Sequence, residues 1–402
     1  MGAAPHTADA CAPRPLKQPA LLRFSLGAPA ASGRIPGLFP KSRPAFSRAS
    51  AGWRAGPDGV WTEVASGLPR AHWMGGRPYL LVEPERTNAV QGALTDADAN
   101  NIPDGLWAVN GAVAGVDMFL DDSTIGPGMM ARWNAISYAG WQETTFRDPS
   151  PAKAIYSFLM KNENESITDQ ILFRGQTTVP STVYEFANVA YTSDWTRWSK
   201  AVDLSAFTDY LSAVHFQLNT SVGSGVKYLA GLQVEYEADW ASTIIFGTAV
   251  DTVREAETCV LENSKGEALD VSRGTLAITV CPLWSYDQPT GDLVLLDMNA
   301  GDFRIFWDQS AAKWAATVGG VTFALSAAAE TFAAETAQEL IVSWQSGVAP
   351  TGRVGAGATQ TGGSAYTAPA AADIYLGSDS SGANQIGAGI GGLEIYSQPG
   401  VL

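Results

Sequence analysis

Short segments that alternate between apolar and polar residues, separated by turn residues, recur along this chain and constrain its fold most. The clearest is Val226–Tyr236, in which the even-numbered residues are apolar or aromatic, whereas Lys227, Gln233 and Glu235 face the other way. A period of two residues is typical of a β-strand with one buried face. The sequence therefore predicts a half-buried strand here.

Further segments rich in β-branched and aromatic residues and bounded by turn residues also predict strands. They are Lys153–Met160, Asp169–Gly175, Thr182–Tyr191, Thr275–Trp284, Asp292–Met298, Asp302–Asp308, Trp314–Val318, Val321–Leu325, Glu339–Trp344, Asp373–Leu376 and Leu393–Tyr396. Gly319-Gly320 is a two-residue hairpin signal. Ala327–Leu340 has helical propensity but lies between two predicted strands, so we expect a loop with one helical turn. Strands at this spacing without intervening helices predict β-sandwiches.

The composition agrees with an all-β fold. The 402 residues include 41 Gly, 22 Pro, 13 Trp and 12 Tyr, which favours turn-rich β structure over helical bundles. The formal net charge of −15 argues against nucleic-acid binding and against attraction to an anionic membrane. No apolar run approaches the roughly 20 residues of a membrane helix, and the first thirty residues do not resemble a signal peptide. We therefore expect synthesis in a reducing cytoplasm.

Three cysteines, Cys11, Cys259 and Cys281, match no zinc-binding spacing. Cys259 and Cys281 lie in strand-like segments that could be neighbours, but we expect two buried free thiols rather than a disulfide.

Residues 1–50 combine many prolines with much of the basic charge of an otherwise acidic chain. Proline fixes φ and removes a backbone donor, so this segment is expected to be extended and poor at forming a core of its own. We predict an arm that is ordered by packing on another surface, and a disordered tail is the alternative. Its charge favours docking on an acidic partner.

One acidic loop has the spacing of a calcium site. Side-chain oxygens at alternating positions with a backbone carbonyl between them can wrap Ca²⁺, and the candidate ligands are Asp96, Asp98, Asn100, the Ile102 carbonyl and Asp104. Position 12 of an EF-hand would be Glu but is Trp107 here, so the loop is no EF-hand. The alternative is an acidic turn without metal.

Catalytic motifs are weak throughout the sequence. There are three histidines and no Gly-x-Ser-x-Gly elbow, and we expect His215 to be a core residue. Gly387–Gly392 matches Gly-x-Gly-x-x-Gly but precedes a strand-like segment instead of a helix, so we expect a glycine-rich loop. Trp141, Trp240 and Trp284 are flanked by polar or turn residues and are candidate sugar-stacking positions, with core packing as the alternative.

Three groups of short motifs resemble a recurrent arrangement in tailed-bacteriophage virion proteins. The first comprises Phe46-Ser-Arg-Ala-Ser50, Gly59-Val-Trp61, Pro69-Arg70 and Tyr79-Leu-Leu-Val-Glu-Pro-Glu-Arg-Thr-Asn88. The second comprises Trp195-Thr-Arg197-Trp-Ser199, Gly231-Leu-Gln233-Val-Glu235 and Ala241-Ser-Thr243-Ile-Ile245, and resembles the end of a carbohydrate-binding-module-like jelly roll. The third, Val253-Arg-Glu-Ala256 with the strands up to Tyr396, resembles a concanavalin A/laminin-G-like sandwich. The Asp96–Gly105 loop is similar to segments that open bacterial carbohydrate-binding jelly rolls.

The resemblance implies an all-β chain with two lectin-like β-sandwiches preceded by an extended arm. The expected divisions are an anchoring arm at 1–50, a small β module at 51–92, a jelly roll at 93–248 and a concanavalin A/laminin-G-like sandwich at 249–402. The motif residues are expected to be structural signatures, and none is assigned a catalytic role.

The expected function is that of a virion structural protein, as a tail fibre, tail tip or head-surface spike. Residues 1–50 would anchor it to capsid, portal or tail proteins, and the sandwiches would bind host surface polysaccharide. Fibres are often trimeric, so we expect a homo-oligomer, and a trimer first. We expect no enzymatic activity; a particle-bound glycoside hydrolase or depolymerase is the alternative.

Overall fold

The computed structural model describes residues 22–25, 44–89, 106–108, 118–121, 130–134, 138–143, 151–162, 167–176, 182–191, 193–205, 213–219, 226–245, 251–263, 266 and 268–400. Regular structure in this part of the chain consists entirely of strands, so the predicted all-β class is confirmed. These residues include no helix that is long and apolar enough to cross a membrane.

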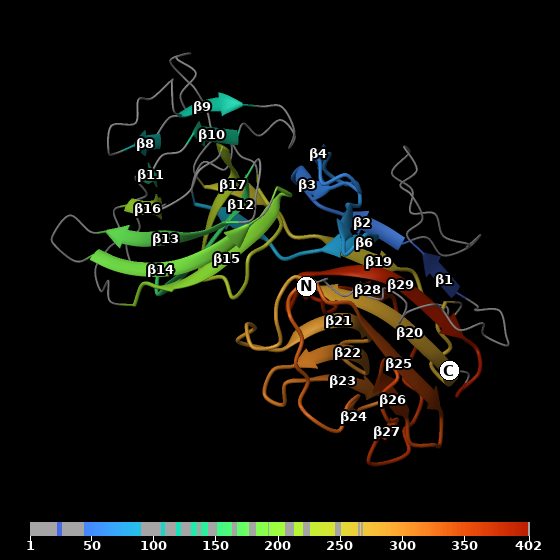
Figure 1. Ribbon diagram of the computed structural model, residues 1–402. Coiled ribbons are helices and arrows are strands. Elements are labelled where there is room, and N and C mark those ends of the chain that lie inside the picture. Colours follow the sequence, from blue (N-terminus) through green and yellow to red (C-terminus); the bar gives the residue numbers. More distant parts are fainter. Residues whose placement is uncertain are drawn as a thin grey trace, which may run out of the picture.

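The strands between residues 106 and 236 form a sandwich of two five-stranded sheets, here called the middle sandwich (Figure 1). One sheet has the order β15-β12-β17-β10-β9 and the other the order β14-β13-β16-β11-β8. Their bounds are β8 Leu106–Ala108, β9 Met118–Asp121, β10 Met130–Asn134, β11 Tyr138–Glu143, β12 Lys153–Asn162, β13 Ile167–Gln176, β14 Thr182–Tyr191, β15 Thr196–Asp203, β16 Ala213–Asn219 and β17 Val226–Tyr236.

A second and larger sandwich contains the strands from residue 258 to the C-terminal end, and is here called the C-terminal sandwich. Its strands are β19 Thr258–Leu261, β20 Arg273–Pro282, β21 Leu293–Met298, β22 Phe303–Asp308, β23 Lys313–Val318, β24 Val321–Ala324, β25 Gln338–Gln345, β26 Thr351–Val354, β27 Gln360–Thr361, β28 Ile374–Leu376 and β29 Ala388–Tyr396. A large apolar core, to which Trp284, Trp307, Trp314 and Trp344 belong, fills the space between its sheets.

Strands from the first 90 residues complete both sheets of the C-terminal sandwich. The eight-stranded sheet has the order β27-β26-β25-β20-β29-β6-β5 and also includes β1 (Leu22–Ser25), which pairs with β29. Its members β5 and β6 span Ala71–Met74 and Arg77–Val82. The seven-stranded sheet has the order β2-β19-β28-β21-β22-β23-β24, and β2 spans Pro44–Ser47.

This topology corrects the expected divisions at 1–50 and 51–92. The described parts of the arm are edge strands of the C-terminal sandwich, and the expected small module contributes β5 and β6 to its larger sheet. The hairpin of β3 (Gly52–Ala55) and β4 (Trp61–Val64) forms a two-stranded sheet within the expected module, and the module's last strand, residues 86–88, pairs with residues 252–254 in a second two-stranded sheet. In Figure 1 the blue strands β2, β3, β4 and β6 lie to the right of the green middle sandwich and above the orange C-terminal sandwich, whereas β1 lies at the right, beside β29. The boundaries failed because β pairing joins segments that are distant in sequence.

Several local predictions match the structure. β17 begins and ends where the alternation predicts, and Gly319-Gly320 joins β23 to β24 with Val318 opposite Val321. Residues 325–337 form the expected loop, but the expected helical turn is wrong: the turn at 334–335 has Glu335 at a positive φ of 58°, and β25 already begins at Gln338. Cys259 and Cys281 are buried free thiols. The glycine-rich segment, by contrast, lies mostly inside β29 rather than before it.

Tight packing explains the glycines of β29. A Cβ atom on Gly389 would lie 2.3 Å from the Met74 side chain and 2.6 Å from Tyr79, both on the β5–β6 hairpin. The hairpin therefore approaches β29 closely because two of the strand's residues there, Gly389 and Gly391, have no side chain.

Candidate functional site

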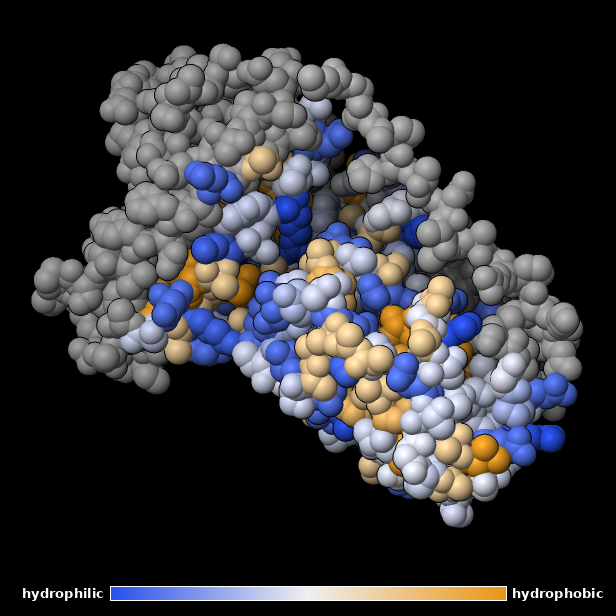
Figure 2. Space-filling model, turned by 60° about the horizontal axis from the view of Figure 1, so that its bottom comes forward, coloured by the Kyte–Doolittle hydropathy of each residue, from blue (hydrophilic) through white to orange (hydrophobic). Residues whose placement is uncertain are grey.

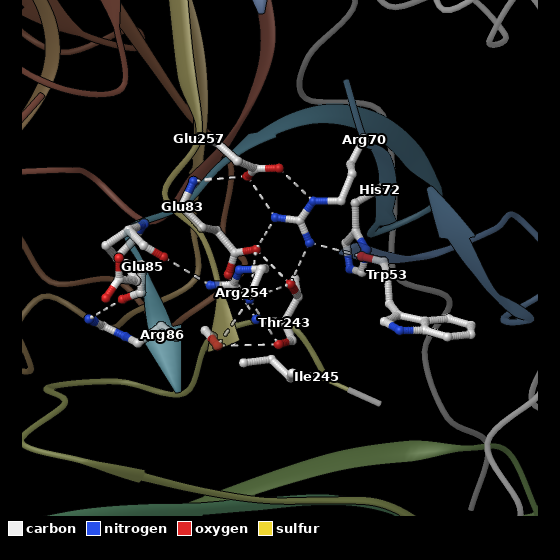
Figure 3. A network of polar contacts seen from close by, with 12 residues as sticks. Trp53, Arg70, His72, Glu83, Glu85, Arg86, Thr243, Ile245, Arg254 and Glu257 are labelled. Atoms are coloured by element: carbon white, nitrogen blue, oxygen red, sulfur yellow. Dashed lines mark hydrogen bonds and ion pairs between the residues drawn. The ribbon is translucent and has the colours of Figure 1, made fainter. Parts of the chain in front are cut away.

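Six polar side chains, five of them charged, come from five chain segments and meet in the interior, between the two sandwiches (Figure 3). We call this group the ionic junction; its members are Arg48, Arg70, Glu83, Thr243, Arg254 and Glu257, all at most 3% exposed. Arg48 follows β2, Arg70 precedes β5 and Glu83 follows β6. Thr243 follows β17, Arg254 ends β18 (Thr252–Arg254), and Glu257 precedes β19.

Glu257 is the centre of the ionic junction. Its Oε1 accepts hydrogen bonds from Arg70 Nε and Arg48 Nη1, each at 2.7 Å. Its Oε2 accepts from Arg70 Nη2 at 2.6 Å and from the backbone N–H of Glu83 at 3.1 Å. Arg70 therefore forms a bidentate salt bridge with Glu257, and this geometry makes arginine–carboxylate pairs strong and directional.

Glu83 is the second buried carboxylate. Its Oε2 accepts hydrogen bonds from Arg70 Nη2 at 2.5 Å and from Thr243 Oγ1 at 2.6 Å, and its Oε1 accepts from the Thr243 backbone N–H at 2.8 Å. Arg254 Nη1 lies 3.4 Å from Oε2. Burial opposes ionisation, but Arg254, Arg70 and the bonds from Thr243 outweigh it and hold the pKa of Glu83 well below its usual range. Glu83 is thus a carboxylate anion at neutral pH.

A second layer of hydrogen bonds connects the junction to β17. Glu235 Oε2 accepts from Gln233 Nε2 at 2.8 Å and from the Ser242 backbone N–H at 2.9 Å. Arg254 Nη1 donates to Ser242 Oγ at 3.2 Å, and Arg197 Nη2 donates to the Ser242 carbonyl. The polar face of β17 is therefore covered at Gln233 and Glu235, which are 0% and 1% exposed, and the expected half-buried strand is corrected for this part of β17.

Asn88 fixes the chain after β7 (Arg86–Asn88) to the same strand. Its Nδ2 donates to the carbonyls of Leu232 and Ile245 at 3.0 and 3.2 Å, and its Oδ1 accepts from the Val234 N–H at 3.0 Å. Asn88 thus acts as a hydrogen-bonding clamp between the N-terminal segment and β17.

An aromatic cluster flanks the junction on the side of the β3–β4 hairpin. Trp53, Trp61 and Tyr228 are buried there, and His72 lies 5.2 Å from Trp61, measured between ring centroids. The Ala55 N–H donates to His72 Nδ1 at 3.0 Å, which requires an unprotonated Nδ1. Burial, with the nearby Arg70 charge, lowers the pKa of His72 to about 3.

The ionic junction and the hydrogen bonds around it bring together the motifs that carry the sequence resemblance. Arg48, Arg70, Glu83, Asn88, Arg197, Gln233, Glu235, Ser242, Thr243 and Arg254 all come from those motifs. Sequence analysis assigned them a structural role but did not bring them together, and it missed Glu257. The sequence does carry a signal for Glu257: it is a charged residue directly between the motif Val253–Ala256 and the apolar strand Thr258–Leu261.

Two of the three tryptophans predicted to stack on sugars are buried. Trp284 is 0% and Trp240 3% exposed, so neither ring can stack on a sugar, and both assignments are corrected to core packing. Their rings lie 6.3 Å apart, and Arg86 covers Trp240 at 5.1 Å from the ring centroid. Trp141 lies in β11, and its side chain is outside the described part of the structure.

The candidate calcium loop, residues 96–104, also lies outside the described residues. Within the part of the chain that the structure describes, no group of three or more His, Cys, Asp or Glu residues is arranged to hold a metal ion. The ionic junction itself has almost no solvent-exposed surface, so what its geometry supports is a rigid connection between segments and not chemistry on a substrate.

No protein-family model and no curated protein matches this chain. Solved structures similar to it include the tandem CBM22-1–CBM22-2 domain of Paenibacillus barcinonensis Xyn10C, at 8% identity over 81% of this chain and 100% of that chain, with a TM-score of 0.27. The family 11 carbohydrate-binding module of Clostridium thermocellum matches at 14% identity, 38% and 95% coverage and a TM-score of 0.26. The enzymatically active domain of bacteriophage CBA120 tailspike protein 4 matches at 9% identity and a TM-score of 0.28, over 37% of this chain and 21% of that chain.

Proposed function

We propose that this chain is a structural protein of a tailed-bacteriophage virion, as a tail fibre, tail tip or head-surface spike. The observation that supports this proposal is the convergence of the virion-protein motifs in the ionic junction. Motifs spread from Arg48 to Arg254 form one buried joint, so the resemblance concerns a whole architectural unit. A rigid joint between two β-sandwiches suits a display protein, since it fixes the direction in which the outer sandwich projects.

The proposal is tested by locating the protein in phage particles. Labelled antibody against the C-terminal sandwich should decorate the tail or the head surface of intact virions, and the chain should be present after gradient purification. A protein found only in the infected-cell lysate and absent from particles would refute the virion assignment. The same particles identify which of capsid, portal or tail proteins the arm contacts.

We further propose that the sandwiches bind polysaccharide on the host surface without hydrolysing it. Trp141 is the remaining candidate for sugar stacking, and several copies on one particle would multiply weak single-site affinities. Full-length protein should adsorb to host cells, and periodate oxidation of the surface glycans should abolish adsorption. Trp141→Ala should weaken adsorption, whereas the exposed Val348→Ala should not.

Absent or periodate-insensitive adsorption would refute the glycan proposal and leave the virion assignment standing. Release of reducing ends from purified host polysaccharide would contradict the absence of hydrolysis and support the depolymerase alternative. Full-length chain is required, because residues 71–89 contribute β5, β6 and Glu83 to the fold.

A further inference from the structure

The outer edge of β29 is shared by two strands from the N-terminal segment. β6 pairs with residues 388–390 only, whereas β1 pairs with residues 392–395. On its other side β29 pairs with β20 along its length, apart from one bulge. Without β1, the backbone of residues 392–395 would be an open sheet edge, and such an edge readily accepts another strand.

The sequence of β1 fits this edge residue by residue. The register places Leu22 opposite Ile395 and Phe24 opposite Leu393, and both β29 residues are 1% exposed members of the core. Between them, Arg23 stands opposite Glu394, a favourable pairing of opposite charges across an antiparallel ladder. Apolar and charged positions of the two strands therefore match.

The two described strands of the arm are joined to the C-terminal sandwich through different contacts. The end of β2 is locked by Arg48, which donates to Glu257 and to the carbonyls of Val64 and Ala65. β1 is held by its four-residue ladder with β29, and 18 residues, 26–43, separate it from β2. A chain of that length can span up to about 60 Å, more than the width of one sandwich.

The rest of the described surface offers little for association between copies. Among the described residues, the large hydrophobic side chains with substantial exposure are Leu68, Val253 and Val348, on three separate segments. Figure 2 shows hydrophilic and hydrophobic residues interspersed on the visible face of the described part. Stable interfaces normally need a larger apolar patch. A strand that pairs with a matching sheet edge can join two copies specifically without a large apolar patch.

We propose that β1 is an exchangeable strand: residues 22–25 of one copy dock on residues 392–395 of a second copy and tie the chains into an oligomer. The hydrogen bonds and side-chain pairs are identical in the closed and the exchanged form, so exchange costs no contacts. The balance between the two forms depends on the concentration of neighbouring copies relative to the effective concentration of the chain's own strand, which is about 1 mM for a short linker. Close packing of copies in an assembly favours exchange. The inference does not depend on glycan binding.

Disulfide trapping tests the proposal in full-length protein. Arg23→Cys and Glu394→Cys are made in separate chains, both carrying Cys11→Ser, because Cys259 and Cys281 are already buried. After the two proteins are mixed and mildly oxidised, mixed disulfide dimers should form and increase with protein concentration up to the millimolar range. Peptide mass spectrometry should identify the link between residues 23 and 394.

The chain offers a matched control in Thr317→Cys and Thr322→Cys, which face each other on β23 and β24, two strands joined by a tight hairpin. Mixed as separate chains, they report only random collisions and should give few dimers. Mixed dimers no more abundant than this control, together with an intrachain link in the Arg23→Cys/Glu394→Cys double variant, would overturn exchange. Absence of any link in the double variant would overturn the pairing itself.

Discussion

At the residue scale, Glu257 supplies one of the two negative charges that face the three arginines of the ionic junction. Glu257→Gln keeps the shape of the side chain but leaves Arg48 and Arg70 with too little negative charge in a buried site. We expect a loss of about 3–5 kcal/mol in the free energy of unfolding. Urea denaturation measures it. The exposed Glu262→Gln is the same substitution five residues later and should change stability by less than about 0.5 kcal/mol; equal losses would contradict the central role of Glu257.

His72 makes stability depend on pH. The folded state holds it neutral with a pKa of about 3, whereas the unfolded chain binds a proton below its ordinary value of 6.5. Stability is therefore full above pH 6.5 and falls as the pH drops from 6.5 towards 3, by about 1.4 kcal/mol per unit. Glu83, with its lowered pKa, adds a further loss below its ordinary value of 4.5.

His72→Gln should remove the part of this slope between pH 6.5 and 5, where carboxylates scarcely titrate. Denaturation midpoints of the variant and the wild type at half-unit intervals measure the difference. An unchanged slope in the variant would show that another group is responsible.

Individual residues also mark the limit of what sequence could predict. The alternation in Val226–Tyr236 predicted the strand bounds and the apolar face, because both depend on local periodicity. It could not predict that Gln233 and Glu235 are buried, since their hydrogen-bond partners Ser242 and Ile245 lie in the irregular segment after the strand, outside the reach of its two-residue period. Polar flanks likewise misplaced Trp240 and Trp284 on the surface.

At the scale of elements, the approach of the β5–β6 hairpin to β29 depends on Gly389. In Gly389→Ala, the new methyl group would collide with Met74 and Tyr79, and we expect a loss of about 1–3 kcal/mol from overpacking. Gly291→Ala is the control, because nothing lies within 4 Å of a Cβ there. Equal thermal midpoints for the two variants would show that the hairpin is free to shift.

The strands from β20 to β25 were predicted to within a few residues, because each carries its own apolar pattern and turn signals. The edge strands β1 and β2 were not, since four residues within a proline-rich basic segment carry too little pattern. Their strand conformation depends on β29 and β19, which lie more than 200 residues away. We expected the arm to be ordered by packing on another surface. Its described strands β1 and β2 do pack on other strands, but these strands, β29 and β19, belong to the same chain.

At the scale of the whole molecule, the arm has two separable parts. Deleting residues 1–43 removes β1 but keeps β2 and Arg48, so we expect the sandwiches to remain folded, with a smaller loss of unfolding free energy than a deletion that includes Arg48. Deleting residues 1–50 also removes Arg48 from Glu257, and stability should fall by about 3 kcal/mol or more. Chemical denaturation of the two truncations measures the difference. Equal stabilities would show that Arg48 does not anchor the arm.

Hydrogen bonds of Thr243 connect the middle sandwich to the ionic junction. Thr243 belongs to the segment after β17, yet its backbone N–H and hydroxyl bind Glu83, and its hydroxyl also accepts from Arg70 and Arg254. Such sharing predicts one cooperative transition for both sandwiches by calorimetry. Thr243→Val removes the hydroxyl that accepts from Arg70 Nη1 and donates to Glu83 Oε2, at a cost of about 1–3 kcal/mol. The transition should then broaden or split, whereas the exposed Thr322→Val should leave it intact. Two resolved transitions in the wild-type protein would show that the junction joins the sandwiches without coupling their unfolding.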